Sequence, residues 1–281
     1  MNIEVNRNPN VDEKTVEGFG DEWLRFDQAG LSPKEHHDVF QLYFSIFPWE
    51  KLPKDAIGFD LGCGSGRWAV LVAPRVAKLH CIDPSAALEV AKSNLLEFQN
   101  CEFHKATVDE IPLDDEAMDF GYSLGVLHHC PDTQAGLSAC VKKLKVGAPF
   151  LVYLYYDFDD KPWWFRSIWR ITDLMRRVIS RLPHSLRYWA SQVIAVSVYF
   201  PLAKLSWAVE KIGLSSKNIP LSIYRNLSFY LMRTDALDRF GTRLEQRFSR
   251  KEIEEMMIIS GLENIEFSDT MPFWCAIGYR K

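Results

Sequence analysis

Three glycines at alternate positions constrain this chain more than any other feature. Gly62, Gly64 and Gly66 follow an apolar run over 56–61 and precede an apolar helical pattern over 68–76. This order is typical of a buried parallel strand that turns sharply into a helix. Glycine serves where φ must be positive or where a ligand must lie against bare backbone. Because open α/β sheets bind ligands at the carboxyl ends of their strands, we expect a ligand-binding loop here, and a plain tight turn is the alternative.

The spacing of these glycines separates the loop from a dinucleotide site. The dinucleotide fingerprint is G-x-G-x-x-G, whereas this chain has G-x-G-x-G with Arg67 as the next residue. A nucleotide-dependent oxidoreductase is therefore disfavoured. The run Asp60-Leu61-Gly62-Cys63-Gly64-Ser65-Gly66 resembles the first motif of the class I S-adenosylmethionine-dependent methyltransferases.

The resemblance runs from about residue 19 to residue 156 and returns in the last fifty or so residues. It implies S-adenosylmethionine as the cofactor, with the loop under its methionine part and ribose and with Asp60 meeting its amino end or a bound water. It also implies an N-terminal helical lid. Aromatic residues at 19, 23 and 26 share one helix face and could form that lid or simply pack on the domain. The expected cofactor-binding residues are Trp23, Asp60, Gly62, Cys63, Gly64, Gly66, Arg67, Asp83, Pro84, Thr107, Val108, Leu124 and Gly125.

The second and third expected strands supply the ribose and adenine candidates. The strand over 78–83 ends in Asp83, about twenty residues beyond the glycine loop, where an acid can accept the ribose hydroxyls. The alternative is an acid that only favours the N-terminus of the next helix. The stretch after the strand over 101–105 resembles the family segment that meets adenine. Its usual acid would fall on Thr107, so the backbone of Thr107 and Val108, or the neighbouring Asp109, would have to serve.

The fourth expected strand, 118–124, runs into Gly125-Val126-Leu127-His128-His129. Many small-molecule methyltransferases carry a similar Ser-x-x-Val-Leu-His-His run, which implies that Leu124 and Gly125 touch the cofactor. Histidine suits general-base catalysis because its unperturbed pKa is about 6.5. His128 and His129 are therefore the catalytic candidates, and packing near the next acid is the alternative. The Asn/Asp-Pro-Pro-aromatic run of amide and base-amine methylation is absent after this strand, and we interpret Cys130 as structural.

Strands and helices alternate as far as 156, which predicts a doubly wound α/β fold. The resemblance adds a mostly parallel seven-stranded sheet with an antiparallel last strand and a helical cap insertion. We expect four parts. These are an N-terminal arm and lid helices (1–55, with 1–15 flexible), the cofactor-binding core (56–156), the helical cap insertion (157–232), and a C-terminal helix and strand pair that complete the core (233–281).

The cap insertion combines a basic helix with an uncharged stretch. Residues 161–187 hold seven Lys or Arg and one acid, and 188–203 holds no charged residue but is short for a membrane span. The segment could be a cap that shapes the substrate pocket, an interfacial surface that meets anionic lipid through 161–207, or an oligomer contact or RNA patch. A net charge of −4 argues against a specific nucleic-acid partner. Substrate candidates where the cap meets the core are Tyr156, Tyr224, Arg225 and Tyr230.

The cysteines and the N-terminal residues indicate the cell compartment in which the protein works. None of the six cysteines forms a C-x-x-C pair, so buried thiols in a reducing cytosol are expected, with no metal site. Residues 1–14 lack the apolar core of a signal peptide, so we expect a protein of the cytoplasm or of its membrane surface. The predicted function is methyl transfer from S-adenosylmethionine to an oxygen, nitrogen or sulfur atom of a small-molecule acceptor. The alternatives are a lipid acceptor and a non-catalytic cofactor-binding scaffold.

Overall fold

The structure is a computed structural model that describes residues 10–158, 162–216 and 219–281. Its centre is a seven-stranded sheet in the order β3-β2-β1-β4-β5-β7-β6, in which only β7 runs antiparallel to its neighbours. The predicted fold class, a doubly wound sheet of the Rossmann-like kind, is confirmed. The strands are β1 (Ile57–Leu61), β2 (Lys78–Ile82), β3 (Cys101–His104), β4 (Phe120–Leu124), β5 (Pro149–Tyr153), β6 (Leu262–Phe267) and β7 (Cys275–Arg280).

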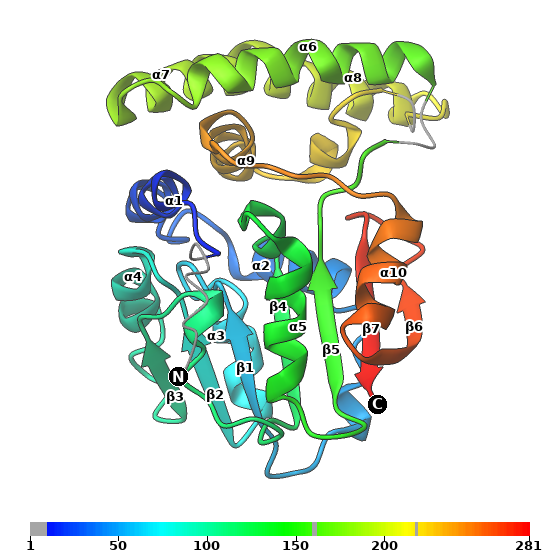
Figure 1. The fold of residues 1–281 in the computed structure, drawn as a ribbon. Helices are drawn as coiled ribbons and strands as arrows, with labels where there is room; N and C mark the ends of the chain where they lie inside the picture. The colour runs from blue at the N-terminus through cyan, green and yellow to red at the C-terminus, as the bar shows by residue number, and fades with distance from the viewer. Residues whose placement is uncertain (1–9, 159–161, 217–218) are drawn as a thin grey trace, which may run out of the picture.

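Helices cover both faces of this sheet (Figure 1). One core lies under α2, α3 and α4, and the other lies under α5 and α10. Because both faces are covered, the central strands carry continuous apolar runs, as the sequence suggests. The helices are α1 (Glu13–Arg25), α2 (Pro33–Tyr43), α3 (Ala69–Val72), α4 (Ala87–Asn94), α5 (Thr133–Lys143), α6 (Trp163–Ile179), α7 (His184–Ile194), α8 (Phe200–Lys211), α9 (Phe229–Gly241) and α10 (Arg250–Ile259). Short 3-10 turns cover Trp49–Lys51, Ala73–Arg75, Val108–Glu110, Leu127–His129 and Ser222–Asn226.

The C-terminal part follows its local sequence signals closely. Ser249 and Glu252 form a reciprocal capping box at the start of α10. The helix ends before Gly261, whose φ of +90° suits a residue without a side chain. β6 and β7 then add an antiparallel pair beside β5, so the predicted strand pair completes the sheet.

The insertion forms a separate layer above the carboxyl ends of the strands (Figure 1). Helix α7, the π-helical segment Ala195–Tyr199 and α8 make one continuous helix, and α9 packs beneath α6 and α7. A small apolar core joins the π segment to α9. The boundary predicted at 232 falls inside α9, whose mixed-charge sequence gives no clear apolar stripe to mark the helix.

The N-terminal segment is more ordered than the predicted flexible arm over 1–15. Asn10 forms two hydrogen bonds with the backbone of Asp132, each 2.7 Å long, and its own N–H donates to Asp109. Asp12 then caps α1 by accepting from the N–H of Thr15 at 2.8 Å. These hydrogen bonds hold residues 10–15 across the edge of the sheet. The rest of the predicted arm, 1–9, lies outside the described residues.

Candidate active site

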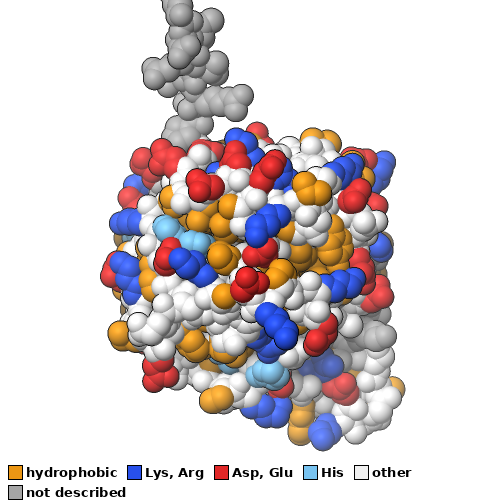
Figure 2. All heavy atoms as spheres, turned by 90° about the horizontal axis from the view of Figure 1, so that it is seen from below, with side chains coloured by type: hydrophobic (Ala, Val, Ile, Leu, Met, Phe, Trp, Pro, Cys, Tyr) orange, Lys and Arg blue, Asp and Glu red, His pale blue; other side chains and the backbone are white. Residues whose placement is uncertain are grey.

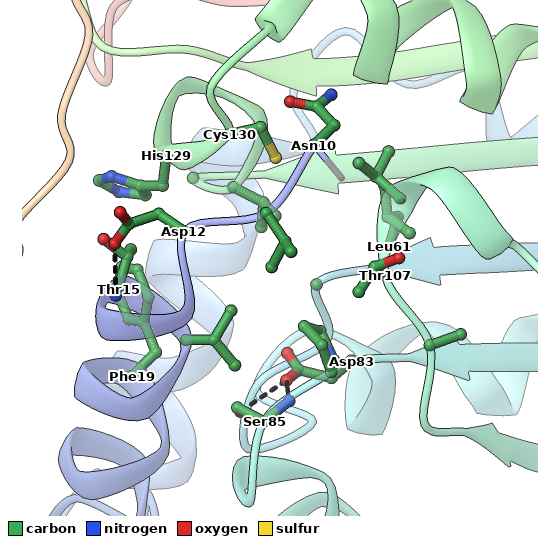
Figure 3. Close-up of a pocket in the computed structure, with 18 of the residues that line it drawn as sticks. Asn10, Asp12, Thr15, Phe19, Leu61, Asp83, Ser85, Thr107, His129 and Cys130 are labelled. Atoms are coloured by element: carbon green, nitrogen blue, oxygen red, sulfur yellow. Dashed lines mark hydrogen bonds between the residues drawn. The ribbon is translucent and has the colours of Figure 1, made fainter. Parts of the chain in front are cut away.

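A cavity lies where β1, β2 and β4 end, between these strands and helix α1 (Figure 3). Side chains of α1 form one side, Leu61 and Thr107 lie opposite, and Asp83 lies between them. The cavity thus occupies the edge of the sheet that the glycine pattern predicts. It is lined by Asn10, Val11, Asp12, Thr15, Val16, Phe19, Trp23, Leu61, Gly62, Asp83, Pro84, Ser85, Ala106, Thr107, Val108, Leu124, Gly125, Val126, His129 and Cys130.

The glycine loop is a left-handed turn with a backbone that approaches its neighbours closely. Gly62 has φ of +75° and exposes its backbone to the cavity. A Cβ there would lie only 2.3 Å from a methyl carbon of Val126. The N–H groups of Gly62 and Cys63 both donate to the carbonyl of Ile82, at 2.7 and 3.1 Å. The backbone of β2 therefore fixes the turn, and only glycine fits at its first position.

Asp83 connects this loop to the second strand and is 7% exposed. Its Oδ2 accepts from the N–H of Gly64 at 2.9 Å, and its Oδ1 accepts from the N–H and hydroxyl of Ser85 at 2.8 and 2.6 Å. Each carboxylate oxygen can accept about two hydrogen bonds. The open position on this carboxylate is therefore on Oδ2, which can take one ribose hydroxyl while the other contacts hold the side chain in place.

Asp60 lies at the end of β1 next to the turn and is 1% exposed. Its Oδ2 has no hydrogen-bond partner in the described part of the chain. Burial raises the pKa of this carboxyl well above its ordinary value, and the nearby charge of Asp83 adds to that rise. A buried carboxyl with an unpaired oxygen fits the predicted place of a ligand ammonium group, which would favour its ionised form.

The cavity brings together most of the expected cofactor-binding residues, but not all of them. Cys63, Gly64 and Gly66 shape the turn from behind, and the indole of Trp23 covers Gly64. Arg67 lies outside the cavity lining, with its guanidinium 4.4 Å from the ring centre of Trp68. The expected residues that do line the cavity are Trp23, Gly62, Asp83, Pro84, Thr107, Val108, Leu124 and Gly125.

The two histidines differ in their access to the cavity. His129 lines it, whereas His128 is fully buried behind it with both ring nitrogens unpartnered among the described residues. Nδ1 of His129 lies 2.7 Å from the carbonyl of Leu244. A carbonyl only accepts, so Nδ1 carries the proton and Nε2, which lacks a partner in the same described ranges, is the basic nitrogen. Of the two catalytic candidates, only His129 lines the cavity, and its Nε2 is buried.

The surroundings of His129 keep the imidazole neutral and hold it in place. Burial lowers the pKa of His129, and the charge of Asp238 and the carbonyl of Leu244 oppose this shift. The ring of Phe19 packs against it at 4.9 Å between centroids. Tyr155 follows β5, donates a hydrogen bond to Asp238 on α9, and stacks 3.9 Å from the ring of His128. The core and the helical layer thus meet directly behind the histidine pair.

None of the four expected substrate residues lines this cavity. Tyr156 packs on Trp274 near the C-terminal strands. The hydroxyl of Tyr224 donates to Asp235 at 2.7 Å, and Arg225 forms an ion pair with Glu210. The hydroxyl of Tyr230 accepts from the N–H of Gln28 at 2.9 Å. The structure gives these side chains roles within the insertion and at its contacts with the core.

Sequence reasoning missed the contribution of the N-terminal segment. Asn10, Asp12 and Thr15 line the cavity because hydrogen bonds hold this segment over it. A signal for the helix was present, since Phe19 and Trp23 are spaced to share one face and both line the cavity. The other lining residues that were not foreseen are Val11, Val16, Leu61, Ser85, Ala106, Val126 and Cys130.

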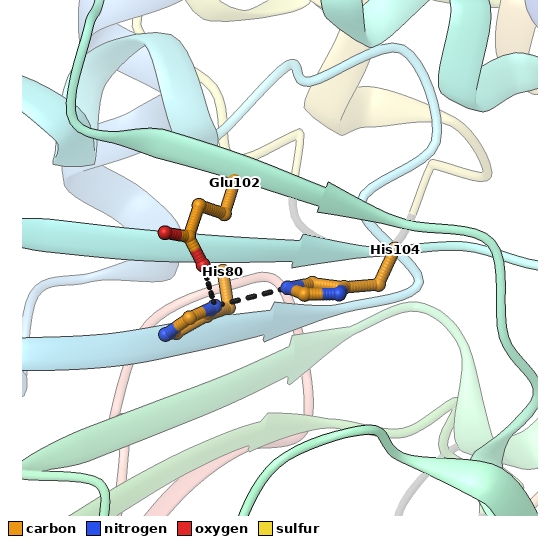
Figure 4. A group of neighbouring side chains, drawn as sticks. All are labelled: His80, Glu102 and His104. Atoms are coloured by element: carbon orange, nitrogen blue, oxygen red, sulfur yellow. Dashed lines mark hydrogen bonds and ion pairs between the residues drawn. The ribbon is translucent and has the colours of Figure 1, made fainter.

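His80, Glu102 and His104 form a second polar group, the edge cluster, on β2 and β3 (Figure 4). Nδ1 of His80 lies 3.0 Å from Nε2 of His104 and 3.3 Å from an oxygen of Glu102. Lys78 neutralises the same carboxylate at 2.7 Å. Because contacts inside the group and the lysine already satisfy these atoms, we assign no metal, and the expectation of no metal site stays a prediction.

The fold is Rossmann-like, and the cavity suits a cofactor that combines an adenosine with an amino acid part. The bare glycine turn, the acid at the end of β2 and the unpaired carboxyl of Asp60 fit such a group. Adenine would lie toward Thr107 and Val108, and the methionine part toward Gly62. Asp60 is buried next to this turn and is not among the residues that line the cavity.

Comparison with known proteins identifies a family for the core of the chain. Residues 59–152 match the family described as "Methyltransferase domain". A ubiquinone biosynthesis O-methyltransferase from Alkalilimnicola ehrlichii is 37% identical over 91 residues, which are 31% of this chain and 37% of that protein. One from Marinobacter nauticus is 29% identical over 150 residues, 52% of this chain and 63% of that protein. The matches thus span about one third to two thirds of the length of these relatives.

A solved S-adenosylmethionine-dependent methyltransferase from Thermotoga maritima shares the fold. Its TM-score is 0.51 at 14% identity, covering 94% of this chain and 100% of that one. Residues 59–152 thus carry a methyltransferase domain, as the glycine motif predicts, and the chain has the fold of a solved S-adenosylmethionine-dependent methyltransferase.

Proposed function

We propose that this enzyme transfers the methyl group to a hydroxyl of a small-molecule acceptor, with His129 as the general base. The observation that carries the proposal is that His129 lines the cavity while its Nε2 has no hydrogen-bond partner among the described residues. Curated relatives named ubiquinone biosynthesis O-methyltransferases support oxygen as the methylated atom. A nitrogen or sulfur acceptor that carries a removable proton would use the same base.

The roles of the residues follow from their contacts. The cofactor, when bound, supplies a methyl group on a sulfonium centre that leaves as a neutral thioether. Asp83 and Gly62 would hold its ribose and amino acid parts, with the buried Asp60 next to the turn, while Leu124 and Gly125 would lie beside the reactive end. Positioning of two reactants in one site supplies a large part of the rate enhancement.

His129 completes this arrangement by accepting the proton that the acceptor loses. Its Nδ1–H donates to Leu244, which fixes the ring orientation and favours the cationic ring once Nε2 is protonated. Two arginines surround the buried Glu245, whose charge also favours protonation of His129. A positioned base of this kind contributes about 10²–10⁴-fold to the rate.

The matched variants His129→Gln and His128→Gln test this role. The acceptor is first found by incubating the enzyme with a cell extract and S-adenosylmethionine carrying a deuterated methyl group, and the labelled product is then identified by mass. We expect His129→Gln to lower kcat at least about 100-fold and to leave cofactor affinity unchanged. His128 has the same chemistry outside the cavity, so His128→Gln should keep most of the activity.

The pH profile separates a base from a structural residue. Because burial lowers the pKa of His129, wild-type activity should be lost only as the pH falls below that lowered pKa. His129→Gln should lose this inflection. A variant that retains both wild-type kcat and the inflection would refute the assignment.

The outward surface of the insertion favours a second candidate, an acceptor that resides in a membrane. The membrane contact, the acceptor itself and a role of the insertion in oligomer formation are proposals. Location in the cytoplasm stays an expectation, supported by the six cysteines, all of which are free thiols.

A further inference from the structure

Helix α6 has its polarity reversed relative to an ordinary surface helix. A helix on a globular protein normally turns its apolar stripe toward the core. In α6 the buried residues are Asp173 and Arg176, which form an ion pair of 2.9 Å. Ile171 and Leu174, by contrast, are 64% and 65% exposed, and Val178 is also exposed. The outward side of α6 is therefore suited to an apolar environment.

The first part of the long helix from His184 to Lys211, up to Val193, repeats the same reversal, whereas its later part packs apolar residues on α9. Its inner side buries Arg187, Ser191 and Gln192, while Trp189 and Val193 on its outer side are 65% and 63% exposed. Arg187 donates to the carbonyl of Gly241 on α9 at 3.1 Å. Two neighbouring segments of the insertion thus expose apolar side chains and bury charged or polar ones.

These surfaces make one outward layer, which we call the outer face. Figure 1 shows α6, α7 and α8 as the top layer of the molecule, with α9 between them and the core. Figure 2 shows the opposite face, where acidic and basic side chains are spread among the others. Soluble monomers rarely leave a contiguous apolar surface of this kind in water. The residues that define it best are Ile171, Leu174, Val178, Trp189, Val193 and Val196.

A row of cations flanks the apolar stripe of α6. Arg166, Arg170 and Arg177 are exposed and are spaced 4 and 7 residues apart, so they share one side of α6, and the exposed Arg181 follows in the turn after the helix. Residues 162–216 hold eight Lys or Arg and two acids, a net charge of +6, although the whole chain carries −4. Charge is thus concentrated on the part of the molecule that also exposes apolar side chains.

We propose that the outer face docks on an anionic lipid surface, with the helices lying in the plane of the membrane interface. Exposed tryptophans, an apolar stripe and a basic flank are the features that bind a helix to this interface. The arginine stems can lie along the lipid while their guanidinium groups meet the headgroups. The proposal deepens the proposed function, because the layer covers the same end of the sheet as the cavity and would place that end next to the membrane (Figure 1).

The structure favours docking over two other arrangements. The helix from His184 to Lys211 is long and apolar enough to cross a membrane by length and composition. Its inner side, however, carries Arg187 and Gln192 in hydrogen bonds to α9 and to neighbouring side chains, which a span through lipid would break. A second copy on the outer face would place the exposed arginines of α6 against the same arginines of its partner, because a twofold dimer pairs each surface with itself.

Vesicle flotation tests the proposal with the full-length enzyme and without any acceptor. We expect the protein to float with vesicles of phosphatidylcholine containing 30% phosphatidylglycerol and to float less with phosphatidylcholine alone. Raising the salt concentration should weaken binding to the anionic vesicles, because exposed charges are screened. A wild-type protein that stays at the bottom with both vesicle types would overturn the proposal.

Two matched triple variants locate the surface. Ile171→Gln/Leu174→Gln/Val193→Gln removes three outer-face side chains and should weaken vesicle binding at least about tenfold. The control, Leu96→Gln/Val146→Gln/Ile259→Gln, changes three equally exposed apolar residues elsewhere and should bind as the wild type does. Equal loss in both variants would refute the assignment.

A third variant tests the charges. Arg166→Gln/Arg170→Gln/Arg181→Gln should abolish the preference for anionic vesicles. Light scattering completes the test. The lipid proposal would be overturned if the wild type did not float with vesicles and formed a stable dimer that the outer-face variant no longer formed. The outer face would then be assigned to contact with a second copy. Vesicle binding needs no methyl transfer, so its outcome is independent of the proposed function.

Discussion

Replacing Gly62 with alanine tests the claim that the cofactor loop is a bare-backbone turn. Two separate costs are expected. Its φ of +75° is unfavourable for a residue with a side chain, at about 1–2 kcal/mol. The new Cβ would also lie 2.3 and 2.5 Å from the two methyl carbons of Val126, and overpacking of this kind costs about 1–3 kcal/mol. We therefore expect Gly62→Ala to lose roughly 2–5 kcal/mol of folding free energy.

Gly147→Ala is the matched control, because it separates the two costs. Gly147 has φ of +79°, but a Cβ at this position would meet nothing within 4 Å. Gly147→Ala should therefore lose only the backbone contribution, about 1–2 kcal/mol of folding free energy. The difference between the two variants then measures the steric contact with Val126.

Thermal unfolding measures these effects, at roughly 2 °C for each kcal/mol in a chain of this size. Val126→Ala should recover more than about 1 kcal/mol of the loss in the double variant, since it removes both close methyl groups. Equal loss in Gly62→Ala and Gly147→Ala, or no recovery from Val126→Ala, would refute the claim that close packing at the cofactor loop requires glycine.

Three further predictions concern titratable side chains. Binding of S-adenosylmethionine should ionise Asp60. Below the raised pKa of this carboxyl, the affinity for S-adenosylmethionine should therefore rise by up to tenfold for each unit by which the pH increases. Calorimetry of Asp60→Asn should show no such pH dependence. Burial alone would raise the pKa of Glu245, but Arg247 and Arg239 outweigh it and leave the pKa lowered; its stabilising contribution is therefore present above the unfolded pKa and lost as the pH falls through the folded one. Thermal unfolding of Glu245→Gln should show a loss of about 3–5 kcal/mol near neutral pH, and an unchanged midpoint would contradict this. The edge cluster is internally satisfied, so Zn²⁺ should leave the unfolding temperature unchanged, and a rise on adding the metal would contradict our assignment.

The sequence predicts the sheet well because its signals are local. Apolar runs that end in turn residues mark the strands, and Gly62 and Asp83 fall at the carboxyl ends of neighbouring strands as expected. Ser249 and Glu252 mark the start of α10 through contacts only three residues apart. Interactions of this range can be derived from spacing alone.

The remaining features depend on contacts between residues far apart in sequence. Asn10 reaches the cavity through hydrogen bonds to Asp132, 122 residues away, which no local pattern indicates. The preference for His129 over His128 depends on the carbonyl of Leu244, 115 residues further on. Tyr224 satisfies its hydroxyl within the insertion, so its position in sequence gave no guide to the cavity. The reversed polarity of α6 likewise emerges only from what α9 covers.

Calorimetric titration with S-adenosylmethionine, repeated with NAD⁺ and with Asp83→Ala and Asp83→Asn, tests the central claim most directly. We expect one S-adenosylmethionine per chain and no binding of NAD⁺. Asp83→Ala removes the one open acceptor position of this carboxylate. A hydrogen bond to a charged group is worth about 1.5–3 kcal/mol, so the variant should bind S-adenosylmethionine roughly 10- to 150-fold more weakly. Binding of NAD⁺ without S-adenosylmethionine, or wild-type affinity in both folded variants, would contradict the account.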